Sequence, residues 1–266
     1  MRVGFIGGGY MGEAMIAALL KQGIASAQDI TVSDVAEARR ETLRSQYGVN
    51  VTDDNAAAAS DNDLVVLAVK PQEFSNVALG LRGKFAPGST ALTIMAGVPV
   101  ERVSRELDHA AVARAMPNTA AAVGQAISVW IASSGVSEQG RANVRKLLGS
   151  MGRELFVEDE AYLDMATAVN GSGPGYVFLF LEAFIDAAIA VGLPRDVAEE
   201  LCIQTLVGSA ALARDTGKQP AELRAMVTSK GGTTAAGLQV MEDADLRGAV
   251  MRAVAAARAR AKELGG

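Results

Sequence analysis

Residues 2–12 read RVGFIGGGYMG and decide the fold. The apolar run Val3–Ile6 has the composition of a buried strand, and Glu13–Lys21 carries apolar residues at helical spacing. A turn made largely of glycine separates the two. The stretch therefore predicts a strand, a glycine turn and a helix, which together open a nucleotide-binding α/β domain.

Gly7, Gly9 and Gly12 have the spacing G-x-G-x-x-G. In a dinucleotide site the first glycine permits a tight turn, and the second lets a pyrophosphate approach bare backbone. The third lets the helix pack close to its strand, and the N–H groups of the first helical turn attract the phosphates. A glycine-rich turn without a ligand is the alternative. The position between a strand and a helix favours the dinucleotide site.

The composition excludes several classes of protein. Half of the 266 residues are hydrophobic and 5% are aromatic, as in closely packed soluble α/β proteins. The net charge is -5, and no block of Lys and Arg predicts contact with nucleic acid. One cysteine, Cys202, allows no intrachain disulfide, and we expect no metal site because His, Cys and acidic residues do not cluster.

The expected location is the cytoplasm. Met1 leads directly into the first strand, which leaves no space for a signal peptide. The most apolar stretch, Tyr176–Gly192, contains Glu182 and Asp186 and is expected to be too short to span a membrane.

Seven further strands are expected before residue 158. They are Asp29–Val32, Asn50–Thr52, Leu64–Val69, Ser89–Met95, Val112–Met116, Gln125–Ala132 and Glu154–Val157. Leu64–Val69 is wholly apolar, as a central parallel strand is, and Gln125–Ala132 is expected at the sheet edge. Small or polar residues follow several of the strands. Because open sheets bind ligands at the carboxyl ends of their strands, we expect a ligand crevice there.

The residues after the second strand leave the type of nicotinamide cofactor open. An acid such as Asp34 would bind the ribose diol and favour NAD. Against this, Ser33, Arg39 and Arg40 could hold the 2′-phosphate of NADP, although the two arginines could equally be solvated on the next helix.

From about Glu160 the apolar period becomes 3.6, which predicts an all-helical second domain. The expected domains are residues 1–158, of Rossmann type, and residues 159–266. The helix predicted at Tyr176–Val191 is apolar around its whole circumference, so we expect it to be buried inside its domain or against a second subunit. The second alternative predicts a homodimer.

Residues suited to acid–base catalysis are scarce. His109 is the only histidine and lies in a polar turn, and Cys202 stands among apolar residues as a small core residue would. Two stretches rich in glycine and hydroxyl groups precede predicted helices, at residues 169–176 (VNGSGPGY) and 228–234 (TSKGGTT). They are either carboxylate-binding helix starts or ordinary capped helices. The four hydroxyls of the second stretch favour carboxylate binding.

These features favour hydride transfer to a C=N bond. Reduction of a carbonyl requires a proton donor such as His or Lys. An imine nitrogen can arrive already protonated, so a site with carboxylate-binding groups and no strong acid suits a cyclic imino acid.

The sequence resembles the pyrroline-5-carboxylate reductase family over essentially its whole length. The residues that carry the resemblance are 5–12 (FIGGGYMG), 68–72 (AVKPQ), 114–119 (RAMPNT), 171–174 (GSGP) and 229–238 (SKGGTTAAGL). The resemblance implies reduction of 1-pyrroline-5-carboxylate to L-proline with NADPH or NADH, with a lean towards NADPH. It also implies a homodimer formed by interlocked helical domains and assembly of dimers into a decamer.

The resemblance also implies a set of site residues. Together with Ser33 and Asp34, the expected cofactor-binding residues are Gly7, Gly8, Gly9, Tyr10, Met11, Gly12, Asn55, Ala68, Val69, Lys70, Pro71, Ala96 and Gly97. The expected substrate-binding residues are Glu160, Ser229, Gly231, Gly232, Thr233 and Thr234. Thr234 would also reach the ring nitrogen and is the expected catalytic residue.

Two residues depart from the family pattern. Lys230 stands where many members have proline, and Asp34 stands where others have a small polar residue, which leaves the NADPH preference open. A β-hydroxyacid dehydrogenase is the alternative enzyme, but the expected lysine is missing from Gly175–Phe180. A protein that senses NADP without turnover is a further alternative, against which the hydroxyl-rich stretch at Ser229–Thr234 argues.

Overall fold

The structure is a computed structural model that describes residues 1–265. The chain divides into two compact units, Met1–Pro174 with Ala256–Gly266 and Gly175–Ala255. They are called the first and second unit.

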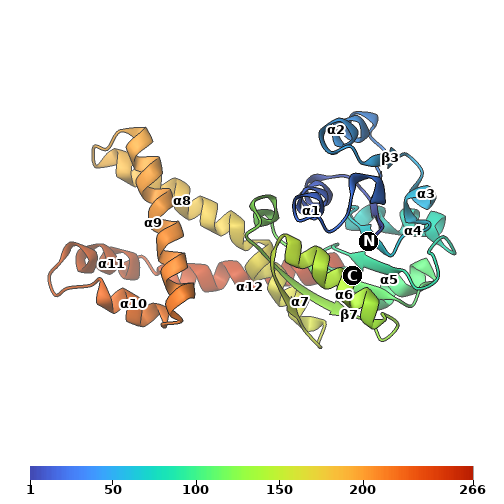
Figure 1. Ribbon diagram of the computed structural model, residues 1–266. Coiled ribbons are helices and arrows are strands. Elements are labelled where there is room, and N and C mark those ends of the chain that lie inside the picture. The colour runs from blue at the N-terminus through green and yellow to red at the C-terminus, as the bar shows by residue number, and fades with distance from the viewer. Residues whose placement is uncertain (266) are drawn as a thin grey trace. The chain divides into compact units, whose positions relative to one another are not determined.

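The first unit is built on an eight-stranded sheet (Figure 1). The strands are β1 (Val3–Ile6), β2 (Ile30–Ser33), β3 (Asn50–Thr52), β4 (Leu64–Leu67), β5 (Thr90–Thr93), β6 (Val112–Met116), β7 (Ala126–Ala132) and β8 (Gly152–Phe156). Their order is β3-β2-β1-β4-β5-β6-β7-β8, and the first six are parallel. This order confirms the predicted Rossmann-type domain.

One prediction about the sheet is wrong. We expected Gln125–Ala132 at the edge, but β7 pairs with β6 on one side and with β8 on the other. β7 runs antiparallel to β6, and β8 runs parallel to β7. The crossover between β7 and β8 passes through α6 (Glu138–Ser150) and places β8 on the edge.

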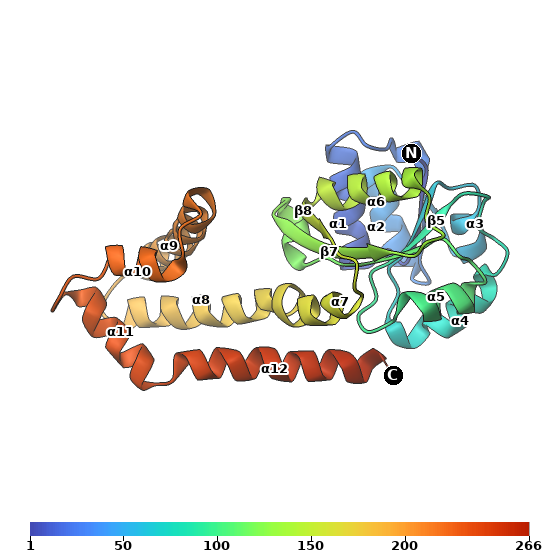
Figure 2. The ribbon, with the colours of Figure 1, turned by 90° about the horizontal axis from the view of Figure 1, so that it is seen from below.

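Helices cover both faces of the sheet (Figure 2). They are α1 (Tyr10–Lys21), α2 (Glu37–Tyr47), α3 (Asn55–Ala59), α4 (Phe74–Leu81), α5 (Val100–Leu107) and α6. One core cluster joins α1, α2 and α6 to one face, and a second cluster joins α3, α4 and α5 to the other. Asn55, expected in a polar turn, is the first residue of α3.

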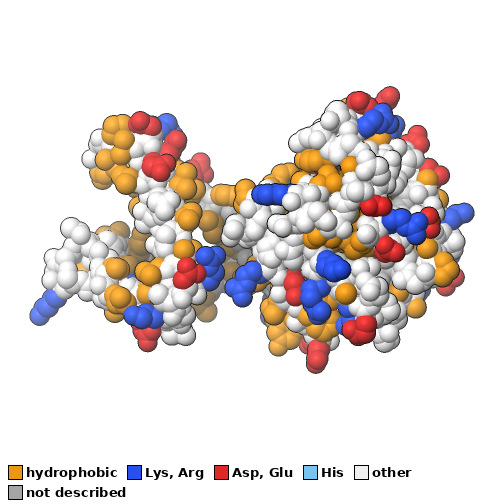
Figure 3. Space-filling view, in the orientation of Figure 1, with side chains coloured by type: hydrophobic (Ala, Val, Ile, Leu, Met, Phe, Trp, Pro, Cys, Tyr) orange, Lys and Arg blue, Asp and Glu red, His pale blue; other side chains and the backbone are white. Residues whose placement is uncertain are grey.

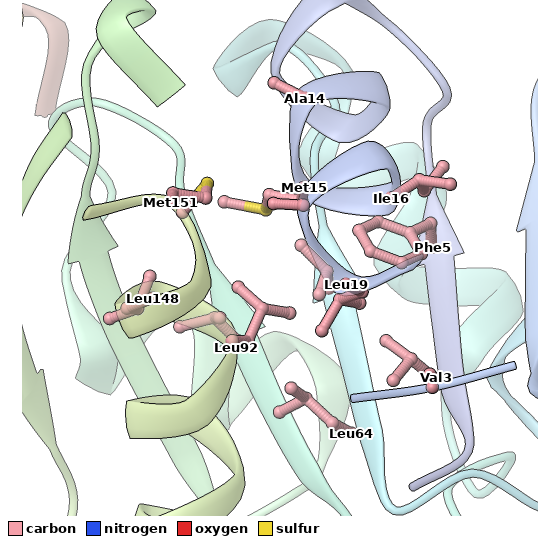
Figure 4. Close-up of a cluster of buried hydrophobic side chains, with 14 of the residues drawn as sticks. Val3, Phe5, Ala14, Met15, Ile16, Leu19, Leu64, Leu92, Leu148 and Met151 are labelled. Carbon is pink, nitrogen blue, oxygen red and sulfur yellow. The ribbon is translucent and has the colours of Figure 1, made fainter. Parts of the chain in front are cut away.

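The larger core cluster holds α1 over the central strands (Figure 4). Met15, Ile16 and Leu19 of α1 are fully buried, as are Val3 and Phe5 of β1. Figure 4 shows the side chains of Met15 and Met151 facing each other, so the residue before β8 also packs on α1. Burial of these side chains fixes where the first turn of α1 lies.

The second unit is helical, as predicted. Its elements are most of α8 (Gly173–Ala190), α9 (Arg195–Thr216), α10 (Pro220–Met226), α11 (Thr233–Asp243) and the first part of α12 (Leu246–Gly265). Ala198 and Cys202 are the buried hydrophobic residues of this unit within the described chain. Figure 3 shows patches of exposed hydrophobic side chains on one face of it.

Burial of the apolar helix inside its own domain, one of our two expectations, is wrong. All residues of α8 are described and none is buried. Exposed hydrophobic residues include Phe178, Leu179 and Phe184. Burial against another subunit, the second alternative, stays a prediction, and exposed apolar area of this kind usually marks an interface.

The apolar helix is also longer than expected. α7 (Ala161–Ala166), a π-helical turn (Thr167–Gly171) and α8 form one helical run, Ala161–Ala190, of 30 residues. By length and composition this run could cross a membrane, so the predicted shortness is wrong. One such helix is by itself weak evidence for a membrane.

The compact units divide later than the predicted domains. The change from strands to helices lies between Phe156 and Ala161, close to the expected boundary at residue 158, whereas the first unit continues to Pro174. The reason is that residues of the helical run bind the sheet. The side-chain amide of Asn170 donates to the carbonyl oxygens of Met116 and Ile127, at 3.0 and 2.9 Å.

Gly152 provides a test of the β7–β8 pairing. Its φ is +145°, and a Cβ atom there would lie 2.2 Å from the carbonyl oxygen of Ala126. We expect Gly152→Ala to lower the free energy of unfolding by at least about 2 kcal/mol. Urea unfolding followed by the fluorescence of Trp130, the single tryptophan, which is buried in β7, measures the change.

Gly149→Ala is the matched control. Gly149 lies in α6, and no described atom approaches its Cβ position within 4 Å. This variant should leave stability unchanged or raise it by up to about 1 kcal/mol. Equal effects of the two substitutions would contradict the described contact between β7 and β8.

Candidate active site

The glycine turn between β1 and α1 has the geometry that a dinucleotide requires. Gly7 has φ +101°, and its Cβ would lie 2.7 Å from the carbonyl oxygen of Ala68. A Cβ at Gly12 would lie 2.7 Å from the carbonyl oxygen of Gly7. At Gly9, by contrast, no described atom beyond its two chain neighbours lies within 4 Å of the Cβ position. The outer two glycines are therefore required by close packing, and the middle one leaves the backbone open to a ligand.

The N-terminus of α1 adds electrostatic attraction for an anion. The helix has twelve residues, its N-cap is Gly9, and no side chain of a described residue caps it. Glu13 is the first residue whose N–H bonds back to the N-cap, at 2.9 Å from the carbonyl oxygen of Gly9. The N–H groups of Tyr10, Met11 and Gly12 are thus available to a pyrophosphate, and the helix dipole favours negative charge there.

Asp34 lies directly after β2, at the edge where a ribose would be bound. Its carboxylate accepts the N–H groups of Gly8 and Ala36, each at 2.9 Å. The glycine turn and the β2–α2 loop are therefore joined by this carboxylate. Each carboxylate oxygen still has a free lone pair, so Asp34 can also accept a ribose hydroxyl.

The two arginines of α2 are engaged within the chain rather than freely solvated. Arg40 Nη1 donates to the carbonyl oxygens of Asp34 and Val35, at 2.7 and 3.2 Å. Arg39 forms an ion pair with Glu13 and donates through Nε to the carbonyl oxygen of Gly8. The hydrogen bond from Arg39 lowers the pKa of Glu13, with burial opposing this effect. Glu13 thus offsets the charge of Arg39, which reduces its attraction for a 2′-phosphate.

Ser33, expected to bind the cofactor, is fully buried. Its hydroxyl lies 2.7 Å from Asn55 Oδ1 and 3.3 Å from the carbonyl oxygen of Phe5. Ser33 is therefore buried within the sheet, and its hydroxyl donates a hydrogen bond to the side chain of Asn55. Its proposed contribution to the ribose site is indirect.

The residues that follow β4 and β5 form the rest of the candidate ligand site at the carboxyl edge of the sheet. Ala68 and Val69 follow β4 and are half-buried, Lys70 is exposed, and Pro71 begins a 3₁₀ turn. Ala96 and Gly97 follow β5, and Gly97 has φ +75°. In a doubly wound sheet of this order, β1–β3 hold one half of a dinucleotide and β4–β6 hold the other. The residues present fit such a ligand.

The hydroxyl-rich stretch of the second unit forms the loop before α11. Gly231 has φ +72°, and Gly232 is the N-cap, with no side chain of a described residue capping the helix. The Thr228 hydroxyl is already bonded, to the carbonyl oxygen of Arg224 at 2.6 Å. Thr233 and Thr234 are exposed. The loop therefore offers hydroxyl and N–H donors that capping does not use, as a carboxylate site requires.

Glu160, expected to bind substrate, has partners within the first unit. Its Oε1 accepts Arg114 Nη1 at 2.8 Å and the N–H of Val100 at 2.9 Å. Arg114 also pairs with Asp164 at 2.9 Å and is 2% exposed. Our reading of the sequence missed Arg114 and Asp164. The one signal was a charged residue within the apolar strand at Val112–Met116.

His109 and Cys202 both lie in packed surroundings. His109 stacks on Phe85, with ring centroids 4.5 Å apart, and its Nε2 lies 3.1 Å from the carbonyl oxygen of Ser89. Burial lowers the pKa of His109, which favours the neutral ring. Cys202 is buried. Among the described residues, no three His, Cys, Asp or Glu side chains are grouped to hold a metal ion.

Comparison with known proteins agrees with both units. Residues 160–264 match the family model of pyrroline-5-carboxylate reductase dimerisation. Residues 2–97 match the model described as NADP oxidoreductase, coenzyme F420-dependent. A pyrroline-5-carboxylate reductase from Synechocystis is 38% identical over 265 residues, which cover 100% of this chain and 98% of that protein.

Two solved structures are also similar over the full length. Pyrroline-5-carboxylate reductase from Coxiella burnetii is 32% identical with a TM-score of 0.91, covering 100% of this chain and 98% of that one. Plasmodium falciparum pyrroline carboxylate reductase, solved with NADP bound, is 26% identical with a TM-score of 0.91 and the same coverage. The glycine turn, the helical second unit and these full-length similarities show that the chain belongs to the pyrroline-5-carboxylate reductase family.

Proposed function

We propose that the chain reduces 1-pyrroline-5-carboxylate to L-proline, the last step of proline biosynthesis. NADPH is the proposed cofactor and NADH the alternative. The observation that carries the proposal is the presence of two uncapped helix N-termini of different character. One lies at an open glycine turn suited to a pyrophosphate, and the other bears free hydroxyls suited to a carboxylate. Full-length relatives of 38% identity that are named pyrroline-5-carboxylate reductases support it.

The reaction needs little from the protein beyond binding and orientation. The bound nicotinamide supplies a hydride to C5 of the ring, and one proton completes the secondary amine of proline. The proton is already on the nitrogen when the substrate binds as an iminium ion. Thr234 is the proposed catalytic residue, because its hydroxyl can accept a hydrogen bond from the ring N–H and so orient the C=N bond.

The substrate carboxylate is the proposed ligand of the loop before α11. Ser229, Thr233 and Thr234 would supply hydroxyl donors, and Gly231, Thr233 and Thr234 would supply N–H donors. Gly232 is proposed to line the site, because its N–H is already bonded to the carbonyl oxygen of Ser229 at 3.0 Å. The cofactor is the proposed ligand of the glycine turn, of Asn55 and of the residues after β4 and β5. We do not assign Glu160 to the substrate site, because its Oε1 atom already accepts hydrogen bonds from Arg114 and from the N–H of Val100.

Self-association is supported by the match to a dimerisation model and by the exposed hydrophobic side chains of α8 and α9. These include Phe178, Leu179, Leu201 and Val207. Exposed apolar area of this kind usually marks an interface. We infer a homodimer in the cytoplasm, and assembly into a decamer stays a prediction from the family resemblance.

The direct test is oxidation of NADPH or NADH by the purified chain in the presence of 1-pyrroline-5-carboxylate. The expected result is cofactor oxidation matched by proline formation. If folded protein binds the cofactor but forms no proline, the sensor alternative replaces the reductase. Oxidation of the cofactor with other carbonyl substrates but not with this imine would favour a dehydrogenase of another kind.

Gly9→Val tests the cofactor site without disturbing the fold. The Cβ position at Gly9 is open and φ is -64°, so valine is tolerated by the protein but blocks the pyrophosphate. Affinity for NADPH, measured by calorimetry, should fall by at least about 100-fold with an unchanged melting temperature. Gly12→Val is the contrast, because its Cβ meets the carbonyl oxygen of Gly7 and should lower the melting temperature itself. Normal NADPH binding by Gly9→Val would place the site elsewhere.

Asp34→Asn tests the discrimination between NADH and NADPH. The substitution removes a charge that repels a 2′-phosphate and keeps an oxygen for one of the two backbone N–H groups. The ratio of NADPH to NADH affinity should rise by about tenfold. Asp215→Asn makes the same change in net charge on the exposed surface of α9 and should leave the ratio as it is. An unchanged ratio in Asp34→Asn would remove Asp34 from cofactor selection.

Thr234→Ala tests the substrate site. Loss of the hydroxyl should lower kcat/KM for 1-pyrroline-5-carboxylate by about tenfold or more, while the Kd of NADPH stays the same. Thr228→Ala is the control from the same loop, because the Thr228 hydroxyl is held by the carbonyl oxygen of Arg224. Steady-state kinetics of the two variants give the comparison, and equal kcat/KM values would exclude Thr234 from the mechanism.

A further inference from the structure

We propose that Glu160 is a positioning residue for the nicotinamide half of the cofactor site rather than a ligand of the substrate. The inference rests on the proposed function, because it assigns the loop after β5 to the nicotinamide. The carrying observation is that one carboxylate oxygen of Glu160 joins three elements of the first unit: β6 through Arg114, the start of α5 through Val100, and the start of α7.

The contact with α5 supplies a cap that the local sequence lacks. The N-cap of α5 is Pro99, which has no side-chain acceptor for the N–H groups of the first turn. Glu160 Oε1 accepts the N–H of Val100, the first residue of the helix, at 2.9 Å. A carboxylate at this position also interacts favourably with the helix dipole. Glu160, sixty residues further along the chain, therefore caps α5.

The capped residue ends a short loop at the proposed nicotinamide site. β5 ends at Thr93, and the chain passes through Ala96 and Gly97 to Val100. Val98 is 1% exposed and belongs to the core cluster beneath the sheet, so it holds the middle of the loop. Glu160 holds the end of the loop. Gly97, with φ +75°, lies just before these two fixed points, and its position depends on both.

The buried guanidinium of Arg114 also fixes the carboxylate of Glu160. Arg114 is 2% exposed, whereas Glu160 and Asp164 are 29% and 28% exposed. A buried guanidinium keeps its carboxylate partners in place, since an unpaired charge there would be costly. A cavity of about 250 Å³ is lined by Gly97, Pro99, Arg114, Glu160 and Asp164. The cofactor loop and the charge cluster are therefore neighbours in space.

Asp164 provides a matched control for Glu160. Both carboxylates pair with Arg114, at 2.8 Å for Glu160 and 2.9 Å for Asp164, and both are exposed to a similar extent. Among the described contacts, only Glu160 bonds to the backbone of α5. Both Glu160→Ala and Asp164→Ala should lower the melting temperature, and Glu160→Ala by more, because it also removes the cap of α5. Only Glu160→Ala should change the cofactor loop.

The experiment compares two ligands by calorimetry with the full chain. One is NADPH, and the other is 2′-phospho-ADP-ribose, which lacks the nicotinamide. Glu160→Ala should weaken NADPH binding by about tenfold, the scale expected for loss of a helix-capping acceptor, and leave the fragment unaffected. Asp164→Ala should bind both ligands as the unmodified chain does. Glu160→Gln keeps an oxygen for the Val100 N–H and should restore NADPH binding.

Three outcomes would overturn the proposal. If Glu160→Ala and Asp164→Ala weaken NADPH binding equally, the cause is a general loss of stability. If Glu160→Ala weakens the binding of NADPH and of 2′-phospho-ADP-ribose equally, Glu160 acts on the whole cofactor site. Unchanged NADPH binding with a raised KM for 1-pyrroline-5-carboxylate would make Glu160 a substrate ligand. Failure of the unmodified chain to bind NADPH would instead overturn the proposed function, on which the positioning role depends.

Discussion

The close approach of the carbonyl oxygen of Gly7 to the Cβ position of Gly12 is the constraint on which the proposed cofactor site depends. A Cβ at Gly12 would lie 2.7 Å from that oxygen, so the first turn of α1 can approach β1 only through glycine. Buried side chains such as Met15 and Leu19 hold the rest of the helix on the sheet. Together they present the uncapped N-terminus of α1 beside the open backbone of Gly9 at the carboxyl edge.

Local patterns allowed much of the fold to be predicted. The glycine spacing around Gly7, the apolar run at Leu64–Val69 and the helical period after Glu160 each depend on neighbours in sequence, and the strands and helices follow them. The position of β7 in the sheet and the exposure of α8 could not be predicted from local patterns. Strand order depends on the pairing of β7 with β8, and the burial of an apolar helix depends on which surface covers it.

The site residues likewise divide into those that the local sequence predicts and those that depend on distant contacts. The glycine turn and the loop before α11 could be proposed as ligand sites from the sequence because their donors belong to contiguous backbone, and both assignments stay predictions. Ser33 and Glu160 were read as ligand-binding residues, whereas the structure gives them hydrogen bonds to Asn55, Arg114 and Val100. These partners lie between 22 and 60 residues away, and no periodic pattern records such a contact.

The central claim is that a hydride passes directly from the nicotinamide to C5 of 1-pyrroline-5-carboxylate. The most direct measurement uses NADPH carrying deuterium at the transferred C4 position, with mass spectrometry and NMR of the proline formed. The account predicts proline with one deuterium, located at C5. Unlabelled proline, or cofactor oxidation without proline, would contradict it.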